Sequence, residues 1–251
     1  MVSMNIEAYD DLTIILPTLN EAENIGPMLS ELRSLYTAAT IIVLDDNSDD
    51  GTHNIVSQIS ERDERIKLVV RDVSDRGLSA SIVDGIMMST TEYFIVMDCD
   101  FQHPPAKVAE IARALREGGD LVIGARTDRG ALPPFRRVSS YAAHLLAYTY
   151  LWFKDQPEST DIMSGFFGGK TKIVQATIKE NYDAIERRGF KILFDILKFC
   201  PRDITIKEID FEFQPRSAGQ SKISPLVISS IIGQCGSVGR TISALMTRLI
   251  S

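Results

Sequence analysis

The residues best suited to chemistry follow a short apolar segment in the first half of the chain. Tyr93–Met97 leads directly into Asp98, Asp100 and Gln102. Because alternate side chains of an extended chain point the same way, these three side chains can converge on one point. Carboxylate and amide oxygens are hard ligands of the kind that Mg²⁺ and Mn²⁺ prefer. The spacing therefore predicts a divalent cation at Asp98, Asp100 and Gln102, with diphosphate oxygens and water completing its shell.

A phosphatase offers a second interpretation of the same acidic pair. In haloacid-dehalogenase-type phosphatases an Asp-x-Asp motif also follows a strand, and its first aspartate is the nucleophile. That motif usually lies on the first strand of its domain and has Thr or Val two residues past the second aspartate. Here the pair follows the fourth strand candidate, and Gln102 stands at that position. The cation-binding interpretation is therefore favoured.

Two further polar clusters each follow an apolar segment. The first, Pro17 to Glu21, includes Asn20, and the second, Asp45 to Thr52, includes Asp46. Either cluster alone is ordinary turn chemistry. At adjacent strand ends of a parallel sheet, however, they form one crevice, where carboxylates can accept hydrogen bonds from ribose hydroxyls or a base N–H. The sequence contains neither Gly-x-Gly-x-x-Gly nor a P-loop, which excludes the dinucleotide and P-loop interpretations.

Basic residues form two groups later in the chain. Arg126 follows an apolar run, and three more arginines, Arg136 among them, lie within the next eleven residues. The forked guanidinium suits phosphate oxygens, so this group predicts a second phosphate site, with a solvated charged loop as the alternative. The second group, Arg216 to Lys222, is a flexible basic loop that could close over a diphosphate.

The elements that must position these residues alternate along the first half of the chain. Continuous apolar runs predict strands over Leu12–Leu16, Thr40–Leu44, Ile66–Val70, Tyr93–Met97 and Leu121–Ile123. Helical patterns between them cover Ala22–Tyr36, Thr52–Arg62, Leu78–Ser89 and Pro105–Glu117. This alternation predicts an α/β fold, a mostly parallel central sheet with helices on both faces. Ligands of such sheets bind beyond the carboxyl ends of the strands, where the polar clusters lie.

The second half has a more mixed pattern. Helices are predicted over Tyr141–Phe153 and Phe190–Phe199, and strands over Gly165–Gly168 and Ile204–Phe213. Ser224-Pro225 has the cap and first-turn signature of a last helix. We therefore expect one domain over residues 10–222 with an amphipathic helical tail over residues 223–251.

Composition narrows the class of protein. The chain has 251 residues, of which 44% are apolar and 24% charged, as in ordinary globular domains. Its net charge of −7 argues against a nucleic-acid partner. Three scattered cysteines without a Cys-x-x-Cys spacing indicate reduced thiols in a cytosolic setting. Neither a signal peptide nor a membrane span is expected from the apolar runs.

At this point the motifs resemble a known family. The chain resembles family 2 glycosyltransferases of the GT-A (nucleotide-diphospho-sugar transferase) fold, specifically the dolichol-phosphate mannose synthase branch of polyprenyl-phosphate hexose synthases. The matching stretches are Leu16–Glu21, Asp45–Ser48, Arg76–Ser79, Val96–Pro105, Ile123–Arg126, Asp161–Phe167, Gly189–Leu197 and Phe213–Lys222. One departure is Leu19, where the family usually has Tyr, so an aromatic stack on the base is not expected.

The resemblance implies a role for each matching residue. The nucleoside would be held by Pro17, Asn20, Glu21 and Asp46. The metal and the donor diphosphate would be held by Asp98, Asp100 and Gln102. The acceptor lipid phosphate would be gripped by Arg126, Arg136 and Ser140. Ser164 and Gly165 would shape the sugar pocket, and Arg216 and Lys222 would contact the donor diphosphate from a mobile loop. The residues closest to the chemistry would be Asp98, Asp100, Arg126 and Arg136.

The activity that this resemblance implies is metal-dependent, inverting transfer of a hexose to a polyprenyl or dolichyl phosphate. Mannose from GDP-mannose is the first expectation, and a UDP-glucose-dependent polyprenyl-phosphate glucosyltransferase is the alternative. A family 2 transferase with a non-lipid acceptor would keep the donor half without needing Arg126, Arg136 and Ser140 together. A nucleotide-sugar-binding module without activity would be expected to lose part of the Asp98, Asp100 and Gln102 set, which is complete here.

A polyprenyl phosphate resides in a bilayer, so the enzyme must reach a membrane surface. Aromatic side chains gather in one segment, at Tyr141, Tyr148, Tyr150, Trp152 and Phe153. In the tail a helical stripe flanked by Arg240 and Arg248 runs over Val227, Ile231, Val238, Ile242, Leu245 and Leu249. Both patterns favour interfacial segments, with core-facing helices as the alternative. The chain resembles the soluble, peripherally bound type, which predicts a cytoplasmic protein on the cytoplasmic face of a membrane.

Overall fold

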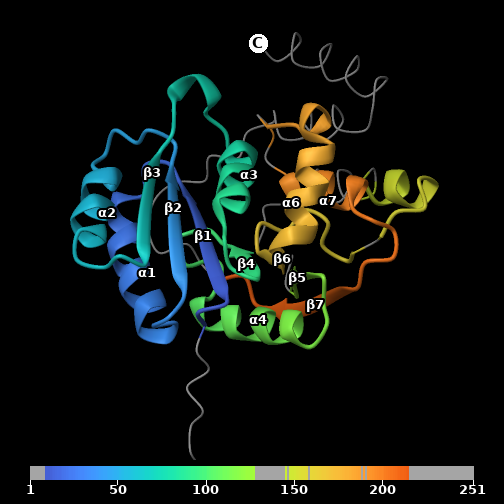
Figure 1. The fold of residues 1–251 in the computed structure, drawn as a ribbon, viewed down its shortest axis with the longest axis horizontal. Helices are drawn as coiled ribbons and strands as arrows, with labels where there is room; N and C mark the ends of the chain where they lie inside the picture. The colour runs from blue at the N-terminus through green and yellow to red at the C-terminus, as the bar shows by residue number, and fades with distance from the viewer. Residues whose placement is uncertain are drawn as a thin grey trace, which may run out of the picture.

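A seven-stranded sheet forms the centre of the molecule, as the computed structural model shows for residues 9–127, 145, 147–157, 159–187, 189 and 191–214 (Figure 1). Its strands are β1 (Leu12–Thr18), β2 (Thr40–Asp45), β3 (Ile66–Val70), β4 (Tyr93–Val96), β5 (Leu121–Arg126), β6 (Phe167–Lys170) and β7 (Ile206–Phe211). Their order across the sheet is β3-β2-β1-β4-β6-β5-β7. The predicted α/β fold is confirmed.

The sheet is parallel except at one strand. β1 pairs in parallel with β2 and β4, β2 with β3, and β5 with β7, whereas β6 is antiparallel to both β4 and β5. The carboxyl ends of six strands therefore meet at one edge of the sheet. The loops that follow β1, β2, β4 and β5 carry the residues predicted to do chemistry.

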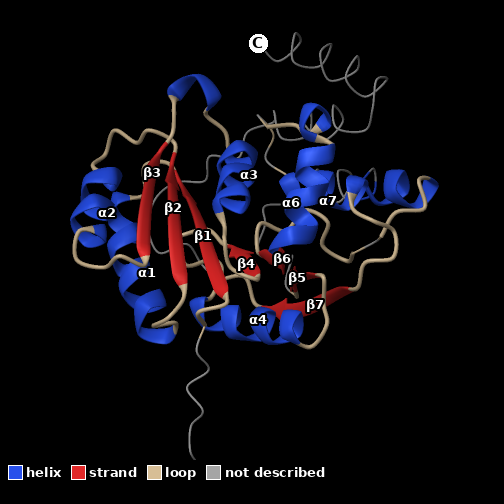
Figure 2. Ribbon diagram, in the orientation of Figure 1, coloured by secondary structure: helices blue, strands red, loops and turns tan. Residues whose placement is uncertain are grey.

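Helices cover both faces of this sheet (Figure 2). They are α1 (Ala22–Leu35), α2 (Thr52–Ser60), α3 (Leu78–Met88), α4 (Val108–Arg116), α6 (Thr171–Glu180) and α7 (Ile192–Phe199), with short 3₁₀ turns η1 (Val73–Asp75), η2 (Pro105–Lys107) and η3 (Tyr182–Ala184). One buried cluster packs α1, α2 and α4 against the sheet, and a second packs α3, α6 and α7 against its other face.

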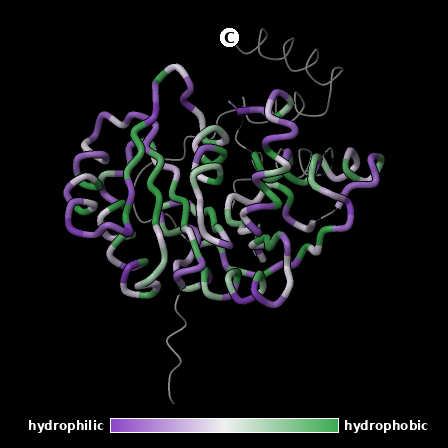
Figure 3. The backbone as a smooth tube through the Cα atoms, in the orientation of Figure 1, coloured by the Kyte–Doolittle hydropathy of each residue, from purple (hydrophilic) through white to green (hydrophobic). Residues whose placement is uncertain are grey.

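Strands β1, β2, β4 and β5 have buried side chains on both faces because successive residues point to opposite sides of a strand. Ile14 and Leu16 lie in the first cluster, and Ile15 lies in the second. β2 divides its apolar residues in the same way. Figure 3 shows hydrophobic colour along the central strands and hydrophilic colour on many of the outer turns. This two-sided burial explains why the strands read as continuous apolar runs.

The first half of the chain matches the predicted elements within a few residues, and the second half differs more. The strand expected over Gly165–Gly168 is β6, two residues further on. Helix α6 was not predicted, because Val174 and Ile178 are its only buried aliphatic residues and give a weak periodicity. Residues 147–153 are helical as predicted. Tyr141 and the tail from residue 223 lie outside the described residues.

β6 depends on a glycine. A Cβ at Gly168 would lie 2.7 Å from the Phe94 carbonyl oxygen and 2.8 Å from Ile95 Cγ1. Both distances are shorter than any real Cβ contact, so only glycine lets β6 fit beside β4. Within the described part of the chain, no helix has both the length and the apolar character that a membrane span needs.

Candidate active site

The acidic motif forms one tight loop after β4. Phe101 has a φ of 65°, in the left-handed region that few side chains adopt, and the Gln102 backbone N–H donates to Asp100 Oδ1 at 3.0 Å. Asp100 is 3% exposed, whereas the Asp98 side chain is 41% exposed. The loop therefore keeps one carboxylate close to the backbone and presents the other to the edge of the sheet.

His103 fixes the start of this loop. Its Nδ1 accepts a hydrogen bond from the Asp98 backbone N–H at 3.0 Å, and its ring stacks on Phe166 with 5.1 Å between centroids. Burial lowers the pKa of His103 to about 3. The imidazole is therefore neutral at physiological pH, with its proton on Nε2, and it is unsuited to act as a base. Sequence reasoning gave His103 no role, although it stands within the most specific motif.

Arg126, at the end of β5, is held by a buried carboxylate. Its Nε and Nη2 donate to Asp161 at 2.7 and 2.8 Å, and Asp161 is 1% exposed. The guanidinium also lies over the Phe213 ring, 5.7 Å from its centroid. This bidentate pair orients Arg126 and balances its charge internally. Asp161 had been part of a matching stretch without a predicted role.

Lys191 brings a further cation to the same region. Its ammonium donates to the Met163 carbonyl oxygen at 2.8 Å. Burial lowers the pKa of Lys191 to about 8, and Arg126 also lowers it, whereas Asp161 and Asp98 raise it. Those influences place Lys191 within electrostatic range of both the metal loop and the Arg126 pair. Its sequence signal is a lysine directly before the apolar segment of α7, to which the sequence analysis assigned no role.

Ser164 and Gly165 border the same loop in different ways. The Ser164 hydroxyl donates to the Gly124 carbonyl oxygen at 2.7 Å and accepts from the Phe166 backbone N–H, so it is committed to the fold. A Cβ at Gly165 would lie 3.4 Å from His103 Cε1 and 3.7 Å from Asp98 Oδ2. Gly165 therefore forms a wall beside the acidic loop, and Ser164 locks that wall to β5.

The loops after β1 and β2 are joined to each other, as their predicted positions require. The Asn20 backbone N–H donates to Ser48 Oγ at 2.8 Å, and Asn20 Oδ1 accepts from the Asp49 backbone N–H at 3.1 Å. The Glu21 backbone N–H donates to Thr52 Oγ1 at 2.9 Å. Pro17 is buried within β1. The two polar clusters thus meet at one end of the sheet.

Asp46 is occupied within the protein rather than open at the surface. It is 5% exposed, and its Oδ1 accepts from Arg71 Nη1 and from the Ser81 hydroxyl. Its Oδ2 accepts from the Gly77 backbone N–H at 3.0 Å. With both oxygens engaged, Asp46 holds the end of β2 against the start of α3.

Arg71 extends this network to the segment before α7. Besides Asp46 it donates to Asp75 at 2.8 Å and to Asp84 at 2.9 Å, and Arg187 contacts the same two carboxylates. The Ala80 backbone N–H donates to the Arg187 carbonyl oxygen at 2.9 Å. The segment that leads to Lys191 is therefore docked on the first turn of α3.

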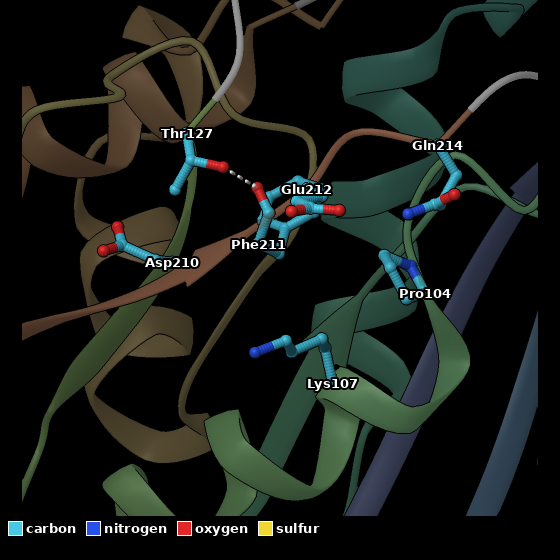
Figure 4. Close-up of a pocket in the computed structure, with 7 residues that line it drawn as sticks. All are labelled: Pro104, Lys107, Thr127, Asp210, Phe211, Glu212 and Gln214. Carbon is cyan, nitrogen blue, oxygen red and sulfur yellow. Dashed lines mark hydrogen bonds between the residues drawn. The ribbon is translucent and has the colours of Figure 1, made fainter.

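A cavity of about 370 Å³ lies beside the acidic loop, below the end of β7 (Figure 4). Its lining residues are Pro104, Lys107, Thr127, Asp210, Phe211, Glu212 and Gln214. The Gln214 backbone N–H donates to the Gln102 carbonyl oxygen at 3.2 Å. The chain that leaves β7 thus lies directly against the predicted metal loop.

A divalent cation at this edge of the sheet would be bound by both protein and substrate oxygens. Among the described residues no group of three or more His, Cys, Asp and Glu side chains gathers as a metal centre. Two carboxylates and the Gln102 amide would hold the ion with oxygens of a bound diphosphate, which fits the hard ligand preference of Mg²⁺ and Mn²⁺. Arg136, Ser140, Arg216 and Lys222 lie outside the described residues.

Fold and site together define a class of protein. The structure resembles glucosyl-3-phosphoglycerate synthase from Mycobacterium tuberculosis, crystallised with Mn²⁺, UDP-glucose and phosphoglyceric acid, with a TM-score of 0.56 over 90% of this chain and 79% of that one. At 18% identity this likeness establishes the nucleotide-diphospho-sugar transferase fold of the GT-A type.

Residues 13–177 match Glycosyl transferase family 2, and the chain belongs to this family of enzymes. Two similar relatives are dolichol-phosphate mannosyltransferases. The protein from Mycosarcoma maydis is 31% identical over 236 residues, covering 88% of this chain and 76% of the relative. The protein from Saccharomyces cerevisiae is 30% identical over 238 residues, covering 89% of this chain and 85% of the relative. The resemblance seen in the sequence motifs is confirmed.

Replacing His103 by Phe tests its hold on the acidic loop. The variant keeps an aromatic ring on Phe166 but leaves the Asp98 backbone N–H without its acceptor. The free energy of unfolding should fall by about 1–3 kcal/mol. The glycosyl transfer rate should fall about 100-fold, the order expected when a reacting group moves by about 1 Å. Urea titration and initial rates measure the two effects. His53→Phe, on α2, is the matched control, and a wild-type rate in His103→Phe would contradict the assignment.

Proposed function

We propose that this protein transfers mannose from GDP-mannose to a polyprenyl or dolichyl phosphate, with inversion at the sugar carbon. The observation that carries the proposal is the alignment of nearly nine-tenths of the chain with relatives named dolichol-phosphate mannosyltransferase. The site supports the proposal, since the acidic loop of Asp98 and Asp100 and the guanidinium of Arg126 lie at the same edge of the sheet, as binding of a sugar-diphosphate and a second phosphate would require.

The donor is proposed to lie along the loops after β1, β2 and β4. Pro17, Asn20 and Glu21 would contact the nucleoside, and Asp46 would hold the surrounding loops through Arg71. Mg²⁺ or Mn²⁺ would be held by Asp98, Asp100 and Gln102. The bound cation would supply positive charge for the departing nucleoside diphosphate. A solved neighbour of the same fold was crystallised with Mn²⁺ and UDP-glucose, which supports a metal in this type of site.

The acceptor phosphate is proposed to act without a general base. A phosphate monoester has a second pKa near 6, so it is largely a dianion at neutral pH and is already nucleophilic. The residues at the site agree, because His103 is neutral, buried and engaged with Asp98. Arg126, oriented by Asp161, would grip the phosphate together with Arg136 and Ser140.

Arg216 and Lys222 are proposed to contact the donor diphosphate from the segment that follows β7. The support is the position of the chain just before them. Gln214 lies against Gln102, within the predicted metal loop, and Arg216 is only two residues further along the chain.

The protein is proposed to work at the cytoplasmic face of a membrane, bound peripherally. The helix over residues 147–153 buries Ala147 and Leu151 but exposes large apolar side chains on its other side. Tyr148, Trp152 and Phe153 are 38%, 61% and 75% exposed. Exposed aromatic residues of this kind suit the headgroup level of a bilayer. We propose the tail over residues 223–251 as a second contact, appended to a catalytic domain over residues 10–222.

The activity is tested by extraction of product into organic solvent. Purified protein with Mn²⁺, a short polyprenyl phosphate and GDP-[¹⁴C]mannose should give label in the organic phase that mild acid releases as mannose. UDP-[¹⁴C]glucose in a parallel reaction should give much less. Omitting the lipid is the control. Label that enters the organic phase only from UDP-glucose would replace mannose by glucose, and label that stays in water with every donor would overturn the lipid acceptor.

Asp100→Asn tests the metal assignment. The substitution keeps the side-chain shape but removes one negative charge from the cation site. Transfer should fall at least about 100-fold, the order expected for losing one strong electrostatic stabiliser. EDTA should abolish wild-type activity, and added Mn²⁺ or Mg²⁺ should restore it. Asp183→Asn, at an exposed position in η3, is the matched control. Full activity in EDTA would remove the metal from the proposal.

Trp152→Ser combined with Phe153→Ser tests the membrane surface. Each exposed ring that enters a bilayer is worth roughly 1.5–3 kcal/mol at full burial, so the double variant should bind anionic liposomes about tenfold or more weakly. Flotation measures binding, and transfer to a short, water-soluble polyprenyl phosphate should be unchanged. Tyr182→Ser, another exposed aromatic position, is the control. Equal flotation of all three proteins would show that this helix does not contact the membrane.

A further inference from the structure

Glu208, on β7, holds a turn of the chain that the proposed function uses only through its last residue. Its Oε1 accepts from the Ser159 hydroxyl at 2.7 Å and from the Thr160 backbone N–H at 2.6 Å. Its Oε2 accepts from the Thr160 hydroxyl at 2.5 Å. Hydrogen bonds to an ionised carboxylate are stronger than those between neutral groups. Both oxygens of Glu208 are therefore engaged by the two residues that directly precede Asp161.

Ser159 extends this hold to Asp161 itself. The Ser159 side chain is buried, and its hydroxyl oxygen accepts from the Asp161 backbone N–H at 3.1 Å while the hydroxyl donates to Glu208. On the other side of the turn, the Ser164 backbone N–H donates to the Asp161 carbonyl oxygen at 3.0 Å. The backbone of Asp161 is therefore fixed from both directions along the chain.

The position of Asp161 matters because its carboxylate orients Arg126, through hydrogen bonds of 2.7 and 2.8 Å. The Arg126 side chain is 21% exposed, so it is accessible to a ligand while it is paired. β5 and β7 pair in parallel, with Arg126 opposite Phe211 and Ile123 opposite Glu208. One pair of strands thus carries both the arginine and the carboxylate that fixes the partner of the arginine.

The surroundings of Glu208 favour positioning over a contribution to overall stability. Glu208 and Thr160 are both exposed. A hydrogen bond at an exposed position contributes little to the free energy of unfolding, because water can replace the lost partner. Its three contacts still restrict where the turn lies, and that restriction passes to the Asp161 carboxylate.

We propose that Glu208 is a positioning residue for the acceptor phosphate. It holds Ser159 and Thr160, these fix the place of Asp161, and Asp161 orients the Arg126 guanidinium. The inference rests on the proposed function, in which Arg126 grips the acceptor phosphate, and it adds a residue that acts without touching a substrate. Without Glu208, the pair of Arg126 and Asp161 would still form, but over a wider range of positions.

The kinetic test compares Glu208→Ala and Glu208→Gln in the full chain. The kcat/KM for a short polyprenyl phosphate at saturating GDP-mannose measures use of the acceptor, and calorimetry with GDP and Mn²⁺ measures donor binding. Glu208→Ala should lower this kcat/KM about tenfold, because displacement of a binding group is costly, and should leave GDP affinity unchanged. Glu208→Gln should recover part of the loss, because its amide oxygen can still accept from the Thr160 backbone N–H.

The route through Ser159 is tested by combining Glu208→Ala with Ser159→Ala. The double variant should lose little more than Glu208→Ala alone, because both substitutions break the same chain of contacts. The thermal midpoint of Glu208→Ala should fall by only about 2–4 °C. Asp203→Ala, at an exposed position in the turn before β7, is the control. A wild-type kcat/KM in Glu208→Ala, a matching loss of GDP affinity, or losses that multiply in the double variant would each overturn the proposal.

The position of Arg126 is measured separately by NMR of ¹⁵N-labelled arginine side chains. Its Nε–H signal is assigned from the loss of that signal in Arg126→Lys. Glu208→Ala should shift or broaden the signal, and Asp203→Ala should leave it unchanged. If the wild type makes no lipid product, the proposed function fails by itself, and an unchanged Arg126 signal in Glu208→Ala then overturns the role of Glu208.

Discussion

The buried guanidinium of Arg71 is the interaction on which the arrangement of the site depends. It is 7% exposed and contacts the carboxylates of Asp46, Asp75 and Asp84. Arg187 contacts two of the same carboxylates, so one network ties the end of β2 to α3 and to the segment before α7. Breaking such a network on one side leaves an uncompensated buried charge, which is strongly destabilising. The loops that carry Asn20, Asp46 and Lys191 are therefore fixed together.

Charge is divided along the edge of the sheet in a way that suits transfer between two anions. Asp98 and Asp100 form an acidic end after β4, which under the proposed function would need a bound cation before it accepts a diphosphate. Arg126 and Lys191 form a basic end nearby, and Asp161 pairs with the arginine. The uncharged His103 stands behind the acidic loop and holds its backbone. Under the proposed function, catalysis rests on positioning and electrostatics, with no side chain required to remove a proton.

The fold alone does not determine which acceptor molecule the protein uses. A solved neighbour with the same fold, glucosyl-3-phosphoglycerate synthase, was crystallised with phosphoglyceric acid, whereas two relatives that align with most of this chain are named dolichol-phosphate mannosyltransferases. The difference must therefore come from residues at the acceptor side. Under the proposed function these residues include Arg126 and the exposed aromatic face of the helix over residues 147–153.

The sequence by itself determined the elements whose signal is local. Two-sided burial gave β1, β2, β4 and β5 continuous apolar runs. The spacing of Asp98, Asp100 and Gln102 after β4 indicated the acidic loop. The tertiary structure alone decided the reversed β6, the capture of Asp46 by Arg71, the pairing of Arg126 with Asp161 and the contact of Lys191 with Met163. These are contacts between residues 25 or more positions apart. Periodicity and spacing report only the neighbours of a residue along the chain, so which distant partner takes each charge is settled by packing.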